Sequence, residues 1–432
     1  MSGVEELLAI VERNRSGERA GITSVCSAER LVLEGAMLQA SRDGSLVCIE
    51  STCNQVNQFG GYTGMTPADF RALVIGAASD MGLAEDRVLI GGDHLGPYVW
   101  RGEPSADAMG KAAGLVRACV AAGYEKIHLD TSMGCADDPP GALDEGVATE
   151  RAAELCRVAE DAWRERGGSA PVYVIGTEVP IPGGELAETE GPVVTGLEDV
   201  DRTLTLTREA FQRAGVGDAW ERVIALVVQP GVEFGEAVVH GYDPEAAREL
   251  VAAVGRYPHL VYEAHSTDYQ TQGALSRLVI DHFAILKVGP WLTFAMREAL
   301  FGLELIEREL LGEDDPERSR LREVLEAEML ARPEHWEPYL SGDARALRVA
   351  RAFSYSDRAR YYWARPALRR AVRRLVANLS ERPIPETLLS QFLPVQGEAV
   401  RAGELVPLPV DLIRHRVMQV MDRYAIACRG RR

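Results

Sequence analysis

The sequence predicts an α/β protein, a (β/α)8 barrel with a C-terminal α-helical extension. Eight short apolar runs, each followed by a helix-like segment, recur between about residues 20 and 310. Nearly all of them end at a polar or charged residue, and beyond residue 312 the pattern is helical without strands. Because 432 residues exceed the roughly 250 of a plain barrel, we expect a TIM-type barrel over residues 1–312 and a helical extension, packed on it, over residues 313–432.

The apolar runs predict strands over 22–26, 46–50, 88–93, 127–130, 172–178, 223–229, 260–265 and 284–287. In such a barrel the C-terminal ends of the strands meet at one mouth, where active sites lie. The polar residues at these ends are therefore expected to come together, namely Asp93, His94, Asp130, Glu178, Gln229, Glu263, His265 and Lys287. Charged groups of both signs gathered inside a barrel indicate an enzyme.

Helical periodicity between the strands predicts helices over 67–81, 106–122, 148–166, 198–214, 244–254 and 269–280, with Thr66 and Asp243 as N-caps. In the extension it predicts helices over 316–329, 344–352, 357–377, 385–392 and 412–427. An acidic stretch at 313–317 and an arginine-rich stretch at 358–374 indicate a helical cap or an oligomer contact, and we expect a homo-oligomer.

The composition narrows the class of partner. A net charge of -18 argues against a nucleic acid or an anionic membrane, because either needs a sustained basic face. No basic and apolar leader opens the sequence and no apolar stretch reaches membrane-spanning length, so we expect a cytoplasmic protein. The seven cysteines form no CxxC pair and are expected to be reduced thiols.

His94 and His265 are the strongest candidates for metal ligands, because imidazole binds zinc and related divalent ions and both residues stand at strand ends. Asp130, Glu178 or Gln229 could complete the coordination sphere. His128 lies one inward layer deeper than Asp130, which favours a supporting position behind the ligands. The expected cofactor is a divalent metal, with zinc favoured and manganese, cobalt or nickel as alternatives.

Asp93 ends the glycine-rich run GGDHLGP (91–97) and is the expected general base; the alternative is that it only orients a histidine. Glu178 and Glu263 are the other candidate catalytic carboxylates. Lys287 is expected to bind phosphate, with a Schiff base as second choice. A predicted helix start at Ser356 or Asp357, with Arg358 and Arg360 just inside, suits phosphate, and a capped surface helix is the equal alternative.

The loop after the second strand concentrates four carboxamides, Asn54, Gln55, Asn57 and Gln58, among glycines and aromatic residues. Amides both donate and accept hydrogen bonds and therefore suit a polyhydroxylated ligand. A polar loop without any ligand is the alternative interpretation. We expect these side chains to contact a sugar at the mouth of the barrel.

The chain closely resembles the so-called non-catalytic subunit family of class II tagatose-1,6-bisphosphate aldolase, which also includes metal-dependent C4 epimerases of ketoses and their phosphates. The matching segments span almost the whole chain: ITSVCS (22–27), NQVNQFGGYTGMTP (54–67), GGDHLGP (91–97), KIHLD (126–130), GTEVP (176–180), VQPGVEF (228–234), YEAHSTDYQT (262–271), FAILKVGP (283–290) and 358–363. Within the seventh segment Ser266 and Asp268 are expected to bind substrate.

Class II aldolases hold zinc with three histidines, on strands three, six and seven, beside an aspartate on strand three. The resemblance carries that aspartate to Asp93 and two of the histidines to His94 and His265. Strand six ends in Gln229, so this three-histidine arrangement is not reproduced. The site is then either disabled or uses a different set of ligands, and we favour the second because so many buried charges need a purpose.

The expected activity is metal-dependent epimerisation at C4, interconverting fructose 6-phosphate and tagatose 6-phosphate by retro-aldol and aldol steps. The alternatives are a catalytic or stabilising subunit of tagatose-1,6-bisphosphate aldolase and a 4-epimerase of a free ketohexose or a uronate. The expected partner is accordingly a small ketose or ketose phosphate, with an aldolase subunit as the macromolecular alternative.

Overall fold

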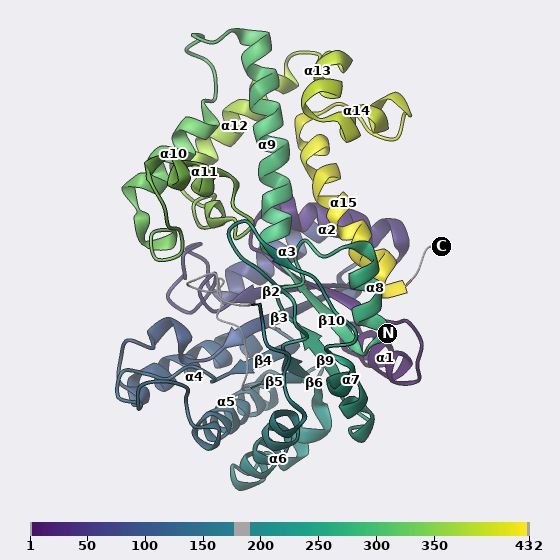
Figure 1. Cartoon of the computed structure of the whole chain (residues 1–432), viewed down its shortest axis with the longest axis vertical. Helices are drawn as coiled ribbons and strands as arrows, with labels where there is room; N and C mark the ends of the chain where they lie inside the picture. Colours follow the sequence, from purple (N-terminus) through teal and green to yellow (C-terminus); the bar gives the residue numbers. More distant parts are fainter. Residues whose placement is uncertain (1, 177–190, 430–432) are drawn as a thin grey trace.

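Eight parallel strands close into a barrel in the computed structural model, which describes residues 2–176 and 191–429 (Figure 1). They are β1 (Ile22–Cys26), β2 (Val47–Thr52), β3 (Val88–Leu95), β4 (Lys126–Asp130), β5 (Val172–Gly176), β6 (Val223–Val228), β9 (Val261–Ala264) and β10 (Phe283–Val288). Each strand pairs with the next in this order, and β10 returns to β1. A short antiparallel hairpin, β7 (Glu233–Phe234) and β8 (Val239–His240), follows β6. The predicted (β/α)8 TIM barrel is confirmed.

The helices around the barrel are α2 (Arg30–Asp43), α3 (Pro67–Asp80), α4 (Ser105–Ala121), α5 (Glu145–Arg166), α6 (Leu197–Arg213), α7 (Arg248–Ala253) and α8 (Gln272–Ile280), and α1 (Gly3–Arg15) precedes β1. The helices that follow are α9 (Pro290–Leu311), α10 (Leu321–Ala331), α11 (Ala344–Phe353), α12 (Pro366–Ser380), α13 (Glu386–Phe392), α14 (Pro394–Arg401) and α15 (Pro409–Arg429). None of the helices in the described ranges combines the length and apolar character needed to span a membrane.

The eighth place in the ring of helices is filled from the far end of the chain. α9 follows β10 but rises away from the barrel alongside α15 (Figure 1), and α15 packs against α2, α8, α9 and β1. The backbone N–H of Gly21, just before β1, donates to the carbonyl of Cys428 in α15 (3.1 Å). A Cβ atom on Gly35 of α2 would lie only 2.8 Å from Val417 Cγ1 of α15. The barrel wall and the C-terminal helix therefore fold against each other.

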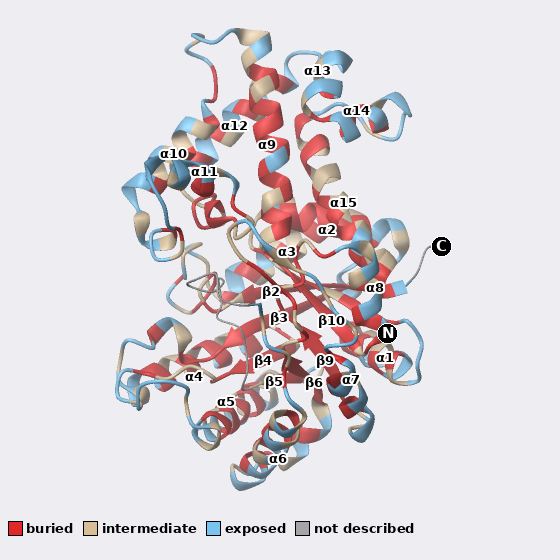
Figure 2. Cartoon of the chain, in the orientation of Figure 1, coloured by how far each residue is buried: buried red, intermediate tan, exposed pale blue. Residues whose placement is uncertain are grey.

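The inside of the barrel is apolar at the N-terminal ends of the strands and charged toward the C-terminal ends. Leu7 of α1 packs there with Val174, Val261 and Ile285 from the strands, so α1 closes the N-terminal end. A second apolar core lies between the strands and the surrounding helices. Figure 2 shows the strands buried and the solvent-facing sides of the outer helices exposed. This arrangement leaves the C-terminal end of the barrel for polar groups.

Of the two predicted N-caps, Thr66 caps its helix and Asp243 does not. Thr66 caps α3 with a capping box to Asp69, as predicted. The helix expected from residue 244 begins later, at Arg248, because the Asp243 carboxylate instead accepts the N–H of Glu245 (2.9 Å) in a preceding turn.

The helix expected over 357–377 is interrupted. Asp357 has a left-handed backbone (φ 43°), a single 3₁₀ turn covers Arg358–Tyr361, and α12 begins anew at Pro366. Proline lacks the backbone N–H that would continue a helix and suits a first turn, so it starts α12. The helix predicted to start at Ser356 or Asp357 is therefore only a single 3₁₀ turn, and phosphate binding at its start stays a prediction.

The contact between α2 and α15 can be tested with two glycines. Gly35→Ala should lower the free energy of unfolding by about 1–3 kcal/mol, because the new methyl group overpacks against Val417. Gly76→Ala in α3 meets nothing within 4 Å and should raise it by about 0.5–1 kcal/mol, since alanine is the better helix former. Urea denaturation of the two variants measures both changes. Equal effects from both substitutions would contradict the packing of α15 on α2.

Candidate metal centre and active site

The C-terminal ends of the strands open into one cavity, roofed in part by the extension. Its described lining includes predicted residues from the ends of β3, β9 and β10 and from the loop after β2: Asn54, Gln55, Asp93, His94, His265, Ser266, Asp268 and Lys287. Arg360 and Tyr361, from the 3₁₀ turn of the extension, line the same cavity. Residues that are some three hundred positions apart in the sequence thus form one site.

Three histidine rings converge at the floor of this cavity. The ring centres of His94 and His265 lie 5.0 Å apart, and His128 lies 5.1 Å from the first and 5.3 Å from the second. The sequence placed His128 in a supporting position; its ring lies close to both other histidines, but it is fully buried and is not among the described residues that line the cavity. The third histidine comes from β4, whereas the aldolase comparison pointed to β6.

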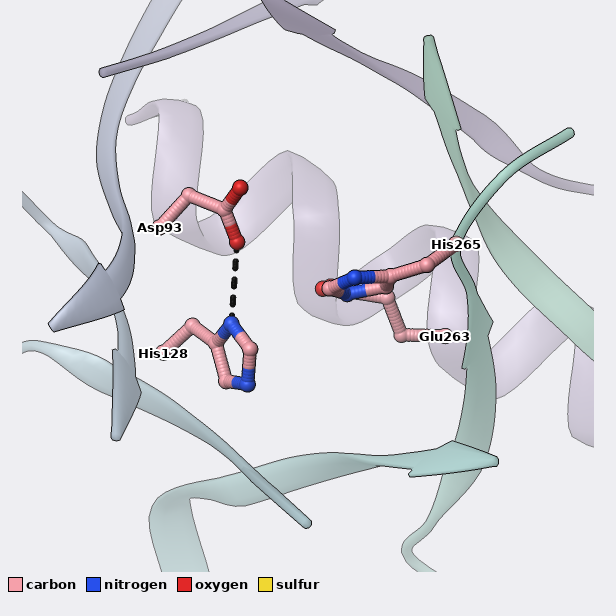
Figure 3. Close-up of side chains that lie close together, drawn as sticks. All are labelled: Asp93, His128, Glu263 and His265. Carbon is pink, nitrogen blue, oxygen red and sulfur yellow. Dashed lines mark hydrogen bonds and ion pairs between the residues drawn. The ribbon is translucent and has the colours of Figure 1, made fainter. Parts of the chain in front are cut away.

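The donor atoms of this cluster fit a divalent metal. Asp93, His128, Glu263 and His265 each offer one ligand atom, and these atoms lie within 4.8 Å of one another. Figure 3 shows Asp93 and His128 facing His265 and Glu263 across the inside of the barrel. His128 Nδ1 lies 2.9 Å from Asp93 Oδ1 and 3.2 Å from the backbone nitrogen of His94, while its Nε2 is buried and makes no hydrogen bond with the described residues. A buried imidazole nitrogen without a partner suits a metal ion.

The pKa values of His265 and His94 shift in opposite directions because their surroundings differ. Burial lowers the pKa of His265 to about 4, so its ring is neutral and keeps a lone pair for a metal. Burial also acts on His94, but Asp93 and Asp130 outweigh it and raise its pKa. His94 Nδ1 lies 2.7 Å from Asp130 Oδ2, so Asp130 orients this ring from behind.

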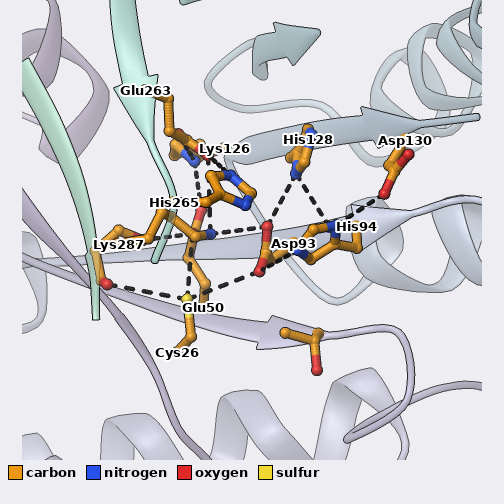
Figure 4. A network of polar contacts seen from close by, with 12 residues as sticks. Cys26, Glu50, Asp93, His94, Lys126, His128, Asp130, Glu263, His265 and Lys287 are labelled. Atoms are coloured by element: carbon orange, nitrogen blue, oxygen red, sulfur yellow. Dashed lines mark hydrogen bonds and ion pairs between the residues drawn. The ribbon is translucent and has the colours of Figure 1, made fainter. Parts of the chain in front are cut away.

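A group of buried ion pairs lies beside the histidines (Figure 4). Lys126 Nζ lies 2.7 Å from both Glu50 Oε1 and Glu263 Oε2. Lys287 Nζ pairs with Glu50 and lies 2.8 Å from Asp93 Oδ1. All of these side chains are at most 5% exposed. Burial raises the pKa of Asp93, but His94 and Lys287 outweigh it, so the pKa lies well below its ordinary value. Asp93 is therefore held as a carboxylate.

Local backbone conformation aims the strand ends at the cavity. β3 carries a bulge between Gly92 and Leu95, and His94 within it has a left-handed backbone (φ 50°). Ser266, just after His265, has the same conformation (φ 53°). Non-glycine residues adopt it at a cost and concentrate at functional sites. Gly91 lies beside Glu50, where a Cβ atom would come within 2.6 Å of Oε1, so this glycine makes room for the buried carboxylate.

Several predicted substrate residues lie elsewhere. Asn57 donates to Cys53 O (3.1 Å) and accepts the N–H groups of Phe59 and Gly61, so it shapes its own loop. Gln58 donates to the carbonyl of Lys111 in α4 (2.8 Å). Neither is among the described residues that line the cavity. Of the four loop carboxamides, only Asn54 and Gln55 reach it.

Three other predicted site residues also have contacts elsewhere or lie outside the cavity lining. Gln229 Oε1 accepts the N–H groups of Gly231 (2.8 Å) and Val232 (2.9 Å), which ties it to its own loop. Ser356 and Arg358 are absent from the described cavity lining, and Arg358 packs 3.4 Å above the ring of Tyr339. Glu178 lies outside the described residues.

Sequence reasoning missed Glu50, Lys126 and Tyr361 as members of the site, whereas it did single out Arg360 as a phosphate candidate. Glu50 and Lys126 could have been found, because each stands at an inward position of its strand by the period of two; Lys126 precedes His128 by two residues. Tyr361 belongs to a turn that the helical pattern concealed.

The fold and the buried cluster define a class of protein: a (β/α)8 barrel with a possible metal site of buried acidic and histidine residues at its mouth. Residues 7–429 match the model of the D-tagatose-1,6-bisphosphate aldolase subunit GatZ/KbaZ-like family, so the chain belongs to that family. The predicted resemblance is confirmed.

Solved structures resemble this chain to different degrees in sequence and in fold. A protein of Sinorhizobium meliloti 1021, described as a probable tagatose 6 phosphate kinase, is 48% identical over 94% of this chain and 100% of its own, with a TM-score of 0.86. The fructuronate-tagaturonate epimerase UxaE of Cohnella laeviribosi is 14% identical over 94% of this chain and 81% of its own, with a TM-score of 0.46. The Campylobacter jejuni fructose-bisphosphate aldolase is 16% identical over 88% and 93%, with a TM-score of 0.44. Likenesses as distant as the last two carry no functional argument.

The chain purified without chelator should bind one divalent ion, and His128→Gln and His265→Gln should each weaken that binding at least about tenfold, because each removes a donor from the cluster. His259→Gln, whose ring lies beside Trp220, is the matched control and should leave binding unchanged. Elemental analysis and metal titration measure this. Full binding by His128→Gln would contradict its place among the ligands.

Proposed function

We propose that this chain is a metal-dependent 4-epimerase that interconverts fructose 6-phosphate and tagatose 6-phosphate by retro-aldol cleavage and re-addition. The observation that carries the proposal is a carboxylate, Asp93, held ionised at the cavity beside a cluster of histidines and Lys287. Membership of a tagatose-bisphosphate aldolase subunit family supports the chemistry. The 48% identical protein of Sinorhizobium meliloti 1021 is described as a probable tagatose 6 phosphate kinase, which supports the substrate class.

The position of the reacting carbon explains why a carbon–carbon bond must break. The hydrogen on C4 is not adjacent to the C2 carbonyl, so its direct removal would leave a carbanion without stabilisation. Removal of the O4 proton instead allows the C3–C4 bond to break, with its electron pair delocalised toward O2. The aldehyde formed at C4 then turns and accepts the same electron pair on its other face, which inverts C4.

Asp93 would accept the O4 proton at the start of this sequence. Its hydrogen bond with His128 and its ion pair with Lys287 (2.8 Å) keep the carboxylate ionised and fix its direction. A divalent ion held by His128, His265 and a neighbouring carboxylate would supply a Lewis acid for the negative charge that develops on O2 and O3. Asn54 and Gln55 line the cavity and offer amides to the sugar hydroxyls.

We assign the phosphate contact to Arg360, whereas the sequence also pointed to Ser356 and Arg358. Arg360 lines the cavity, and its guanidinium donates to backbone carbonyls of the turn that carries it, which fixes its position. A guanidinium binds phosphate with directed hydrogen bonds. Together with Lys287 it brings positive charge into a cavity whose floor contains buried carboxylates.

The chain alone should convert fructose 6-phosphate to tagatose 6-phosphate, and a chelator should stop the conversion. In heavy water the product should carry no deuterium at C4, because retro-aldol inversion keeps the original hydrogen. NMR of the product measures both. A parallel incubation with ATP tests phosphoryl transfer, and we expect no change in the number of phosphates.

Deuterium at C4 would contradict the retro-aldol route. Release of triose phosphate from a ketose bisphosphate without epimerisation would favour the aldolase alternative, and turnover of only free ketohexose or uronate would move the substrate class. No conversion of any ketose by the chain alone would favour a stabilising subunit.

Asp93→Asn should lower epimerisation of fructose 6-phosphate by at least about a hundredfold, since a general base typically contributes that much. The amide is nearly isosteric, and Lys287 keeps its pairing with Glu50, so folding should persist. Steady-state kinetics with matched metal content measure the loss. Turnover within a few-fold of the parent would remove Asp93 from the reaction.

A further inference from the structure

Inversion at C4 places O4 on opposite sides of the carbon chain in the two epimers. The group that takes the O4 proton from one epimer is therefore badly placed to serve the other. On the proposed epimerase chemistry, the same cavity must therefore hold a second proton donor and acceptor. The wall formed by β3 already supplies Asp93, so the second group belongs on another wall.

Most titratable groups on the described lining already make ion pairs or hydrogen bonds with protein groups, or belong to the histidine cluster. Lys287 pairs with buried carboxylates, and Cys26 Sγ lies 3.8 Å from Asp93 Oδ2, on the same side of the site. Asp268 accepts the backbone N–H groups of Gly289 (3.1 Å) and Trp291 (2.7 Å), which hold it in the wall. His94 and His265 belong to the histidine cluster.

Tyr361 differs from these groups in its surroundings. It lines the cavity from the turn of the extension, and its Oη accepts from Arg360 Nη2 (3.1 Å) and from Arg358 Nη1 (3.5 Å). Its ring is stacked on His335 at 4.7 Å, with the two planes 10° apart, and meets the edge of Tyr62 at 4.8 Å. Two guanidinium groups occupy the oxygen lone pairs, which leaves the hydroxyl hydrogen free to point to another acceptor.

The two guanidinium groups also favour loss of that hydrogen. Burial raises the pKa of Tyr361, but Arg360 and Arg358 outweigh burial, so the pKa lies below its ordinary value. Tyr62 is the natural comparison, because it lines the same cavity and burial raises its pKa. Of these two tyrosines, Tyr361 is the one whose surroundings favour the phenolate.

We propose that Tyr361 is the second acid–base group of the reaction and serves O4 in the tagatose epimer, while Asp93 serves it in the fructose epimer. Starting from fructose 6-phosphate, Asp93 takes the O4 proton and the C3–C4 bond breaks to an enediolate and an aldehyde. The aldehyde turns, C3 attacks its other face, and the O4 alkoxide takes the proton of Tyr361. Asp93 is then protonated and Tyr361 is a phenolate between two arginines; proton exchange with water restores both.

The test separates cleavage from epimerisation in Tyr361→Phe, which keeps the ring and its stacking. Hexacyanoferrate(III) oxidises an enediolate, so its reduction reports C3–C4 cleavage from each epimer. We expect Tyr361→Phe to lose epimerisation at least about a hundredfold, to keep cleavage of fructose 6-phosphate and to lose cleavage of tagatose 6-phosphate. Asp93→Asn should show the opposite preference. Tyr339→Phe, which keeps the ring below Arg358, should behave like the parent chain.

Each outcome of this experiment either supports or overturns the role of Tyr361. Complementary cleavage by the two variants supports the assignment. Epimerisation by Tyr361→Phe at the parent rate, or its loss of cleavage from both epimers, would overturn the role of Tyr361 alone. Absence of epimerisation by the parent chain would overturn the proposed function, and this inference with it.

Discussion

Charges buried inside a barrel must be paired, and this constraint organises the whole site. Glu50, Lys126, Glu263, Lys287 and Asp93 form a continuous network in which each charge faces an opposite one. Removing Lys126 or Lys287 would leave carboxylates without a positive partner in a low-dielectric interior, at a cost of about 3–5 kcal/mol. The network therefore fixes the positions of the side chains that contact it, such as Asp93 and His265.

Neighbouring buried charges set the ionisation of Asp93 and the orientation of His265 and His94. Lys287 holds Asp93 as a carboxylate, Glu263 orients His265 through its Nε2 (3.0 Å), and Asp130 orients His94. These supports leave His128 Nε2 as a buried donor without a hydrogen bond to the described residues. A carboxylate kept ionised beside neutral imidazole is the combination that a metal-assisted base needs.

The extension completes the site as well as the barrel. α15 fills the eighth place in the helical ring, and the turn that carries Arg360 and Tyr361 closes one wall of the cavity. That turn is anchored to α9 through Asp357, whose carboxylate accepts from Arg297 Nε (2.7 Å) and Thr293 Oγ1 (2.6 Å). The extension and the barrel are thus coupled at the place where substrate would bind.

The sequence by itself determined the barrel, the polar strand ends and the family, because strand periodicity and the glycine-rich motifs are local patterns. It correctly brought Asp93, His94, His265 and Lys287 to one cavity. Only the tertiary structure decided that His128 joins the histidines, that Gln229 and Asn57 serve their own loops, and that Arg360 and Tyr361 enter the cavity. The positions of His128, Arg360 and Tyr361 depend on contacts with distant parts of the chain, which a local pattern does not encode. Gln229 and Asn57 form hydrogen bonds within their own loops, and the residue types alone do not specify those loop conformations.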